Sequence, residues 1–241
     1  MDKTMSQDYI SPAELVAWVQ REFETQQDPE KAIAMTAYMK NRFPFWGIQA
    51  PAQERIAKQR YPHLKAWVTA DWLGETALLL YKQPQREFHY FAVGLLRKFH
   101  DRLPASFLPT VEQLVITHSW WDTIDPLAYR ITGSLVLRFP ELLPTIDLYS
   151  RHENLWLRRV AILHQLDFKQ KTDVERLFRI CTLNAASTEF FIQKAIGWAL
   201  REYAKTDHAA VIDYVRENHD RLANLSKREG LKHTGLDWRS L

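Results

Sequence analysis

Glycine and cysteine are scarce in this sequence. Its 241 residues include seven glycines, few for a fold that depends on tight turns, whereas the helix-favouring residues Leu, Ala, Glu, Lys, Arg and Gln are abundant. The one cysteine, Cys181, lies in the apolar run RLFRICTL and cannot form a disulfide within the chain. The composition therefore predicts an all-α protein with a buried thiol, and nothing in it demands an oxidising compartment.

Long apolar runs and cofactor motifs are also missing. No stretch reaches the roughly 18 apolar residues of a membrane span, and the opening MDKTMSQDYISP lacks the apolar core of an export signal. The nine histidines form no HExxH motif, and the sequence has no CxxC, no Gly-rich phosphate loop and no GxSxG. We therefore expect a cytoplasmic protein without a membrane partner, a metal or another cofactor, and without acyl-transfer chemistry.

The charges are nearly balanced. With 32 basic and 29 acidic residues the net charge is +3, which excludes neither nucleic-acid nor protein partners. Scattered basic residues could extend a phosphate-binding surface, although such residues usually form a solvated face. They are Arg97, Lys98, Arg176, Arg179, Lys205, Lys227 and Arg228.

Several helix starts are marked by capping residues. Ser11 is followed by a proline and, three residues on, by Glu14, which predicts a helix to about Gln26. Asp28 and Pro29 predict a second helix through EKAIAMTAYMKNRF. The segment FPFWGIQAP predicts a packed loop before a third helix through AQERIAKQR. Further helix starts are predicted near the prolines at 62, 84, 104, 140 and 144.

A weak internal repeat suggests stacked helices. Small apolar triplets stand at residues 92–94, 161–163 and 195–197, spaced by 69 and then 34 residues. Spacing near 34 is typical of stacked helical pairs, which cannot bury their apolar faces alone and form a superhelix with one concave side. A hydrophobic content of 46%, without a linker or low-complexity segment, predicts a single domain over residues 1–241.

The stretch SWWDTIDPLA places two tryptophans beside two carboxylates. In a helix Trp121 and Asp125 share a face and Trp120 points about 100° away, so one tryptophan can serve the core and the other a surface. The alternative is that both are core aromatics and that Asp125 caps a new helix at Pro126. Because proline disfavours a helical conformation in the residue before it, we expect Asp125 at a kink or helix junction. Asp122 is expected to support the first helical turn.

An arginine interrupts the apolar stripe of NLWLRRVAILHQL. Leu155, Ile162 and Leu166 share a helical face, and Arg159 falls inside it. A guanidinium there needs a partner or a route to solvent. An internal ion pair, a snorkelling side chain and a phosphate of a ligand all remain open.

The segment EFFIQKAIGWALREYAK carries a large aromatic stripe. Phe191, Ala195 and Trp198 line one helical face, and Lys194 and Arg201 lie near its margin. Such a stripe is common in core packing, and a stripe edged by bases also suits contact with DNA. Lys194 and Arg201 are therefore candidate DNA-binding residues.

Taken together, these motifs resemble a known family. SWWDTID, LWLRRVAILHQL, EFFIQKAIGWALREYAKT and LSKREGLKH, preceded by DPEKAIAMTAYMKNRFPFWGIQAP, are similar to segments of the AlkD-like DNA glycosylases. These HEAT-like-repeat enzymes excise alkylated purines from DNA. The matching segments lie in the same order and span about residues 28 to 233, nearly the whole chain.

The resemblance implies an α-superhelix, a solenoid of HEAT-like helical pairs, whose concave face binds double-stranded DNA containing alkylated purines. By motif position it implies that Asp125 is the catalytic carboxylate and that Trp121 and Trp198 are aromatics at the lesion. It also implies that Arg159 contacts the DNA backbone and that Tyr38 contacts DNA. We expect a monomer without a cofactor, associated with the nucleoid when it is bound to DNA.

The implied reaction fits these residues. A purine alkylated at N3 or N7 carries positive charge and leaves without prior protonation. The enzyme therefore has only to stabilise the oxocarbenium-like sugar that forms. Asp125 can stabilise that cation and orient water, while tryptophan rings face it. No amine nucleophile is required, so the expected product is an abasic site. The family is thought to leave the lesion stacked rather than to extrude it into a pocket.

Two other functions stay open on the sequence alone. The chain could be a non-catalytic member of the family that binds DNA structures, or a helical-repeat scaffold for protein partners. A scaffold has no reason to bring together an aspartate, an arginine and two tryptophans. The combination therefore favours the enzyme.

Overall fold

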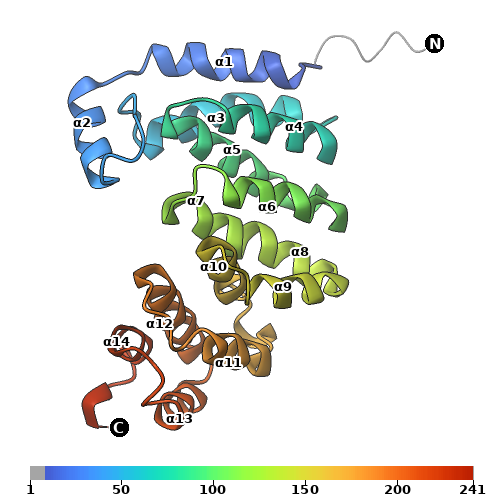
Figure 1. Ribbon diagram of the computed structural model, residues 1–241. Helices are drawn as coiled ribbons and strands as arrows, with labels where there is room; N and C mark the ends of the chain where they lie inside the picture. The colour runs from blue at the N-terminus through green and yellow to red at the C-terminus, as the bar shows by residue number, and fades with distance from the viewer. Residues whose placement is uncertain (1–8, 241) are drawn as a thin grey trace. The chain divides into compact units, whose positions relative to one another are not determined.

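The computed structural model describes residues 9–240, and all of their regular secondary structure is helical (Figure 1). The all-α prediction is therefore confirmed. Most of the opening segment MDKTMSQDYISP lies outside the described residues. The helices pack into two compact units, of which the first ends at Thr110 and the second begins at Val111. The single domain over residues 1–241 stays a prediction.

The first unit packs long helices side by side around an aliphatic and aromatic core. Its helices are, in chain order, α1 (Pro12–Glu24), α2 (Pro29–Tyr38), α3 (Ala50–Leu64), α4 (Ala70–Tyr81) and α5 (Arg86–Lys98). Within the unit α1 lies along α4, α4 along α5, and α3 contacts both α1 and α5 (Figure 1). Short 3₁₀ turns then lead to α6 (Leu108–Ile116), in which the boundary falls; they are His100–Arg102 and Ala105–Phe107.

Capping residues start the first helices as the sequence predicts. The Ser11 hydroxyl accepts from the backbone N–H of Glu14, and the Glu14 carboxylate accepts from the Ser11 N–H, so a complete capping box begins α1. Asp28 caps α2 through the N–H of Lys31. The prediction of a helix start near Pro62 is wrong, because this proline lies in the last turn of α3, which continues to Leu64 although Pro62 cannot donate a helical hydrogen bond. The other four prolines lie at or just before the start of a helix or 3₁₀ turn.

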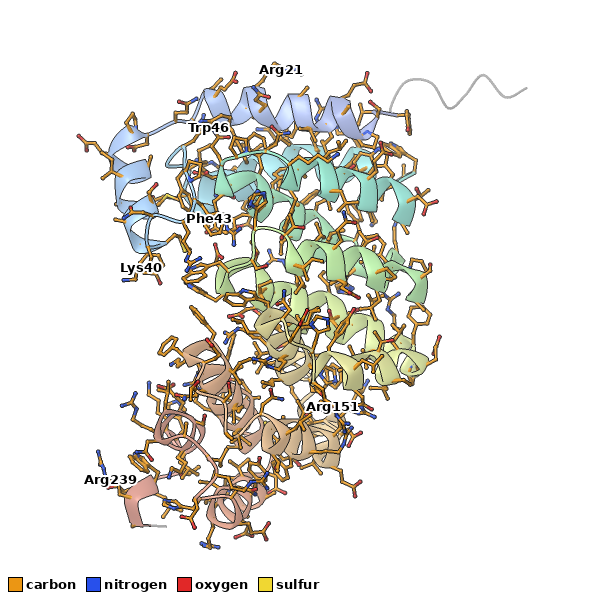
Figure 2. The ribbon with its side chains drawn as sticks, in the orientation of Figure 1. Arg21, Lys40, Phe43, Trp46, Arg151 and Arg239 are labelled. Atoms are coloured by element: carbon orange, nitrogen blue, oxygen red, sulfur yellow. The ribbon has the colours of Figure 1, made fainter. Side chains whose placement is uncertain are left out.

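A buried carboxylate on α5 holds the loop between α2 and α3. Oε1 of the fully buried Glu87 accepts from three successive backbone N–H groups, those of Trp46 at 3.0 Å, Gly47 at 2.9 Å and Ile48 at 3.1 Å (Trp46 is labelled in Figure 2). Gly47 has a φ of 87°, and a Cβ there would lie 2.1 Å from the backbone oxygen of Asp28, so only glycine fits. Burial raises the pKa of the Glu87 carboxyl, and the backbone hydrogen bonds oppose this shift. The predicted packed loop is confirmed.

The second unit is built from the remaining helices. They are α7 (Trp121–Pro126), α8 (Gly133–Arg138), α9 (Leu143–Tyr149), α10 (Leu155–Leu163), α11 (Val174–Leu183), α12 (Phe190–Ala204), α13 (His208–Glu217) and α14 (Asn224–Gly230). A π-helix, Leu127–Thr132, joins α7 to α8, and 3₁₀ turns occur at Pro140–Leu142, Lys169–Lys171 and Trp238–Ser240. Within the unit α10 contacts α7, the π-helix, α9, α11 and α12, and α12 packs against α14 (Figure 1). None of the helices in residues 9–240 is long and apolar enough to span a membrane.

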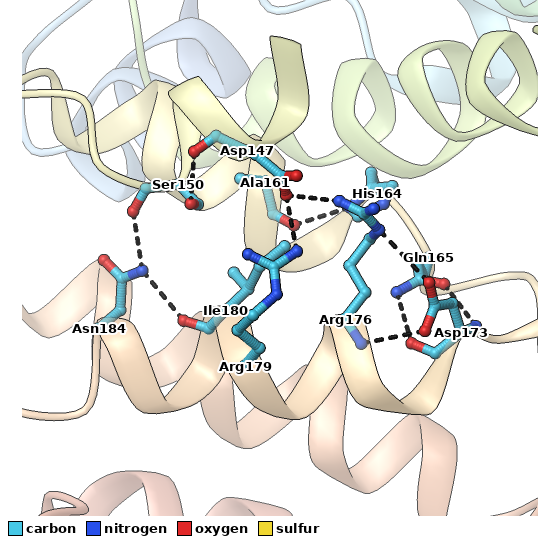
Figure 3. Close-up of polar contacts among 10 residues, drawn as sticks. All are labelled: Asp147, Ser150, Ala161, His164, Gln165, Asp173, Arg176, Arg179, Ile180 and Asn184. Atoms are coloured by element: carbon cyan, nitrogen blue, oxygen red, sulfur yellow. Dashed lines mark hydrogen bonds and ion pairs between the residues drawn. The ribbon is translucent and has the colours of Figure 1, made fainter. Parts of the chain in front are cut away.

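Polar side chains tie α9, α10 and α11 together (Figure 3). The Asp147 carboxylate on α9 accepts from Arg176 and, at 2.8 Å, from Arg179, both on α11. Against the cost of partial burial, these guanidinium groups hold the pKa of Asp147 below its usual range. At the end of α10 the buried His164 donates from Nδ1 to the backbone oxygen of Ala161 at 2.7 Å, and burial lowers the pKa of His164 to about 4. Ion pairs and hydrogen bonds therefore hold these three helices together, in addition to apolar packing.

Candidate active site

Asp125 lies in α7, one helical turn after Trp121. The chain is already helical from Trp121 onward, so the alternative that Asp125 caps a new helix is wrong. Pro126 ends α7 and offers no N–H for a helical hydrogen bond. The chain then widens into the π-helix, a feature often found at functional sites. The junction expected at this position is therefore a change of helix type rather than a break.

Arg159 on α10 binds the Asp125 carboxylate through two hydrogen bonds. Nε donates to Oδ1 at 2.7 Å and Nη2 donates to Oδ2 at 2.9 Å. Asp125 is 8% exposed and Arg159 is 4% exposed. Nη1 of Arg159 donates to the backbone oxygen of Phe191, on α12. Of the partners left open for Arg159, the internal ion pair is therefore the one that the described residues contain.

Burial governs the electrostatics of this pair. It raises the pKa of the Asp125 carboxyl, and the hydrogen bonds and charge of Arg159 oppose the shift. Loss of either partner would leave the other as an uncompensated charge in a nearly dry position. Arg159 thereby allows a carboxylate to stay ionised where few water molecules can reach it.

Aromatic rings at the start of α7 and on α10 and α12 pack against one another, and one of them, Phe191, lies with its ring centroid 6.0 Å from Cζ of Arg159. The ring of Trp120, at the N-cap of α7, lies 4.8 Å from the ring of Phe191 and 5.8 Å from that of Trp156. This packing agrees with the core side predicted for Trp120. The half-buried Trp198 on α12 meets Tyr129 of the π-helix edge to face, with ring centroids 5.9 Å apart. Aromatic contacts therefore link α12 to the chain on both sides of Asp125.

α12 carries the candidate DNA-binding residues along one stripe. Lys194, Trp198 and Arg201 recur at four- and three-residue spacing and share a helical face. Both cations are ion-paired with Glu229 on α14: Lys194 Nζ lies 3.2 Å from Oε1 and Arg201 Nη1 lies 2.8 Å from Oε2. Against the cost of partial burial, these cations hold the pKa of Glu229 below its usual range. Close approach requires Gly197, where a Cβ would lie 2.5 Å from the Glu229 Cβ.

The remaining candidates do not belong to this stripe. Tyr38 belongs to the first unit, where it ends α2 and is 68% exposed. Among the scattered basic residues, Arg176 is paired with Asp147, and the buried Lys227 donates to the backbone oxygen of His219. Arg176 and Lys227 therefore stabilise the second unit and do not extend an open basic face.

Two residues that contact the stripe on α12, Tyr129 and Glu229, were not among the candidates from the sequence. Tyr129 follows Pro126, where the helical register changes, and Glu229 lies in a helix too short for its buried face to be assigned from a pattern. The pairing of Asp125 with Arg159 does correspond to a spacing in the sequence. These residues are 34 positions apart, which equals the spacing of the later apolar triplets.

The side chains of the site are a carboxylate, a guanidinium and aromatic rings. Among residues 9–240 there is no group of three or more His, Cys, Asp or Glu side chains that could hold a metal ion. Cys181 is fully buried, and burial raises the pKa of its thiol to about 12, which confirms the buried thiol expected from the sequence.

Comparison with known proteins identifies the family. A family model described as DNA alkylation repair enzyme matches residues 19–234. The chain belongs to this family. The resemblance noted in the sequence is therefore confirmed, and the protein is a DNA alkylation repair enzyme with an all-α, solenoid-like fold.

One solved structure supports the same assignment, and a second shares the fold. A protein from Enterococcus faecalis, described as "Predicted DNA alkylation repair enzyme", is 34% identical and superposes with a TM-score of 0.81, covering 88% of this chain and 98% of its own. The structure of smu.31 from Streptococcus mutans UA159 shares the fold of this DNA alkylation repair enzyme, with a TM-score of 0.58 at 17% identity over 77% of this chain and 92% of its own. None of the curated proteins compared gives a significant match.

Proposed function

We propose that this DNA alkylation repair enzyme is a monofunctional alkylpurine DNA N-glycosylase. It hydrolyses the N-glycosidic bond of purines alkylated at N3 or N7 in duplex DNA and leaves an abasic site. The observation that carries the proposal is the buried, bidentate pair of Asp125 and Arg159 within an aromatic cluster. Burying a charged pair costs free energy, and a protein scaffold would gain nothing from it.

The proposed reaction needs no general acid. The alkylated purine is cationic, so the bond between C1′ and the purine nitrogen breaks with both electrons passing to a neutral leaving base. The sugar gains oxocarbenium character, which the Asp125 carboxylate stabilises electrostatically. Water then attacks C1′, and its proton passes to Asp125 or to solvent. Because burial raises the pKa of Asp125, the carboxylate is a better acceptor for that proton than an exposed aspartate.

Arg159 acts in this proposal as a positioning residue for Asp125. Its guanidinium holds both carboxylate oxygens, and its bond to the Phe191 carbonyl anchors it to α12. The phosphate contact implied by the family resemblance would add a second role. The salt dependence of DNA binding distinguishes the positioning of Asp125 from contact with a phosphate, because only a phosphate contact releases counterions when DNA binds.

The aromatic residues would face the reacting sugar. Trp121 begins the turn that carries Asp125, and Trp198 sits on the stripe of α12 with Lys194 and Arg201. Their π faces would stabilise cationic character, and the two bases would hold the DNA backbone. We propose that DNA lies against a concave surface of helical pairs with the lesion still stacked. Because the enzyme would approach the lesion from the DNA backbone, no binding pocket would limit the size of the adduct.

Release of free base from duplex DNA containing 7-methylguanine or 3-methyladenine tests the proposal. We expect Asp125→Asn to lower the single-turnover rate by at least about 100-fold, the scale lost when one electrostatic stabiliser is removed. Asp213→Asn is the matched control, since it makes the same change at an exposed carboxylate paired with Arg216. Urea unfolding of both variants separates loss of chemistry from loss of folding.

Each result of this experiment has a defined meaning. Equal base release by the wild type and a folded Asp125→Asn would refute the role of Asp125. No release by either protein, with DNA binding retained, would support a non-catalytic DNA binder, which the engagement of both Asp125 oxygens by Arg159 also favours. For Arg159→Ala we expect weaker DNA binding and a salt slope reduced by about one. An unchanged slope would restrict Arg159 to positioning.

A further inference from the structure

A cavity in the first unit opens between α3 and α5. Its volume is about 970 Å³, at the upper end of the roughly 300–1,000 Å³ typical of ligand pockets. All of its lining residues lie between Met35 and Lys98. The cavity therefore belongs to the first unit alone and shares no residue with the cluster around Asp125.

Aromatic side chains line one part of this cavity. Tyr61 comes from α3, and Tyr90 and Phe91 come from α5. Phe91 is almost fully buried, at 4% exposed, whereas Tyr61 and Tyr90 are half-buried and keep part of their side chains accessible. Burial raises the pKa of Tyr61 to about 12, so its side chain stays uncharged at neutral pH. Rings of this kind accept the flat face of a nucleobase, and such stacking tolerates every base.

Cations line another part of the same cavity. Lys58, Arg97 and Lys98 stand against a single carboxylate, Glu54. Lys58 pairs with Glu54 at 2.9 Å. Within residues 9–240 neither Arg97 nor Lys98 takes part in an ion pair, in contrast to the paired cations of α12. Both are exposed and available to a phosphate.

Gly94 keeps the cavity open between these two parts. It lies on α5, one turn from Tyr90 and Lys98, and only the Tyr61 hydroxyl lies near an added Cβ, at 3.6 Å. A larger side chain would meet no backbone there and would occupy the cavity. Glycine is also a poor helix former, so its replacement would not weaken α5.

We propose that this cavity binds a single nucleotide, with the base against the rings of Tyr61 and Tyr90 and the phosphate on Arg97 and Lys98. The ligand is either a free nucleotide or one nucleotide of a single strand, since both offer the same base and phosphate. The inference does not depend on glycosylase activity, because none of these residues takes part in it.

Fluorescence of 2-aminopurine deoxyribonucleoside 5′-monophosphate tests the proposal with the full chain. We expect stacking to quench the probe, and Gly94→Leu to weaken its binding by at least about tenfold, as loss of one base stack predicts. Arg97→Ala and Lys98→Ala should each weaken it by about tenfold. Arg21→Ala, which removes a cation that points away from the unit in Figure 2, should leave binding unchanged.

A thymidine trinucleotide with 2-aminopurine at its centre separates the two sources. Tighter binding of the mononucleotide would assign the cavity to free nucleotides, and tighter binding of the trinucleotide would assign it to a single strand. Absence of binding by both probes would overturn the proposal, as would unchanged binding by a folded Gly94→Leu. Equal affinity for the unphosphorylated nucleoside would overturn the role of Arg97 and Lys98. Base release from methylated DNA is measured separately, so failure of either proposal leaves the other standing.

Discussion

The two units each bury a carboxylate, and they hold it in opposite ways. In the first unit Glu87 is held by backbone N–H groups of a loop, and its Oε2 has no hydrogen-bond partner among the described residues. In the second unit both oxygens of Asp125 are held by the side chain of Arg159. A side-chain partner can rotate or bind another anion, whereas a backbone partner moves only with its loop. The arrangement at Glu87 therefore serves the fold, and the arrangement at Asp125 leaves room for chemistry.

The largest effect is expected from Arg159→Ala. This change leaves Asp125 buried without a compensating charge, which should lower the free energy of unfolding by about 3–5 kcal/mol. Urea denaturation at neutral pH measures it. Arg216→Ala is the control, because its exposed pair with Asp213 should contribute less than about 1 kcal/mol. Equal losses in the two variants would mean that the buried pair is no more tightly coupled than a surface pair.

Glu87→Ala should have the next largest effect. It leaves three N–H groups without an acceptor, of which those of Gly47 and Ile48 are buried and that of Trp46 is part-buried, at a cost of about 3 kcal/mol, roughly 1 for each group. Glu87→Gln keeps one acceptor oxygen and should cost clearly less. Amide hydrogen exchange at Gly47 and Ile48 should quicken in the alanine variant alone. If glutamine were as damaging as alanine, the negative charge rather than the acceptor atom would be what the loop requires.

A third buried group, His164, extends the comparison to pH. Its pKa is lowered to about 4 in the folded chain, against about 6.5 when unfolded, so the unfolded state binds more protons between these values. Stability is therefore lost as the pH falls through this window, by about 2 kcal/mol between pH 7 and pH 4.5. Urea unfolding of wild type and His164→Gln at both pH values isolates the contribution. A pH dependence that survives the substitution undiminished would have to come from other groups.

The smallest effect is expected where charges are already paired near the surface. Glu229→Gln should release Lys194 and Arg201, tighten binding to duplex DNA a few-fold and steepen the salt slope by about one to two. Fluorescence anisotropy across a salt series measures both changes. Asp213→Asn, which frees the exposed Arg216, serves as the control. A slope that does not differ from the control would exclude Lys194 and Arg201 from phosphate contact.

Local features of the fold were predictable from the sequence because they depend on neighbouring residues. Ser11 with Glu14, and Asp28 with Pro29, determine where helices begin through contacts three or four residues long. The partner of Arg159 was not predictable, because a guanidinium in an apolar stripe satisfies itself equally well with an internal carboxylate or with a ligand. The hydrogen bonds between Glu87 and its loop were not predictable for another reason. Backbone N–H groups are the same in every residue except proline, so the pattern of side chains does not reveal them.

The π-helix that follows Pro126 accommodates an extra residue next to the site without turning Asp125. A π-helical turn contains more residues than an α-helical turn, so this stretch stores an insertion inside a helix. Deleting one residue, such as Ala128, would let the chain continue as an ordinary α-helix with Asp125 and α8 facing nearly as before, because the wider turn already makes up for the extra residue. The same deletion within an α-helical stretch would turn Asp125 by about 100° relative to the rest of the helix and away from Arg159.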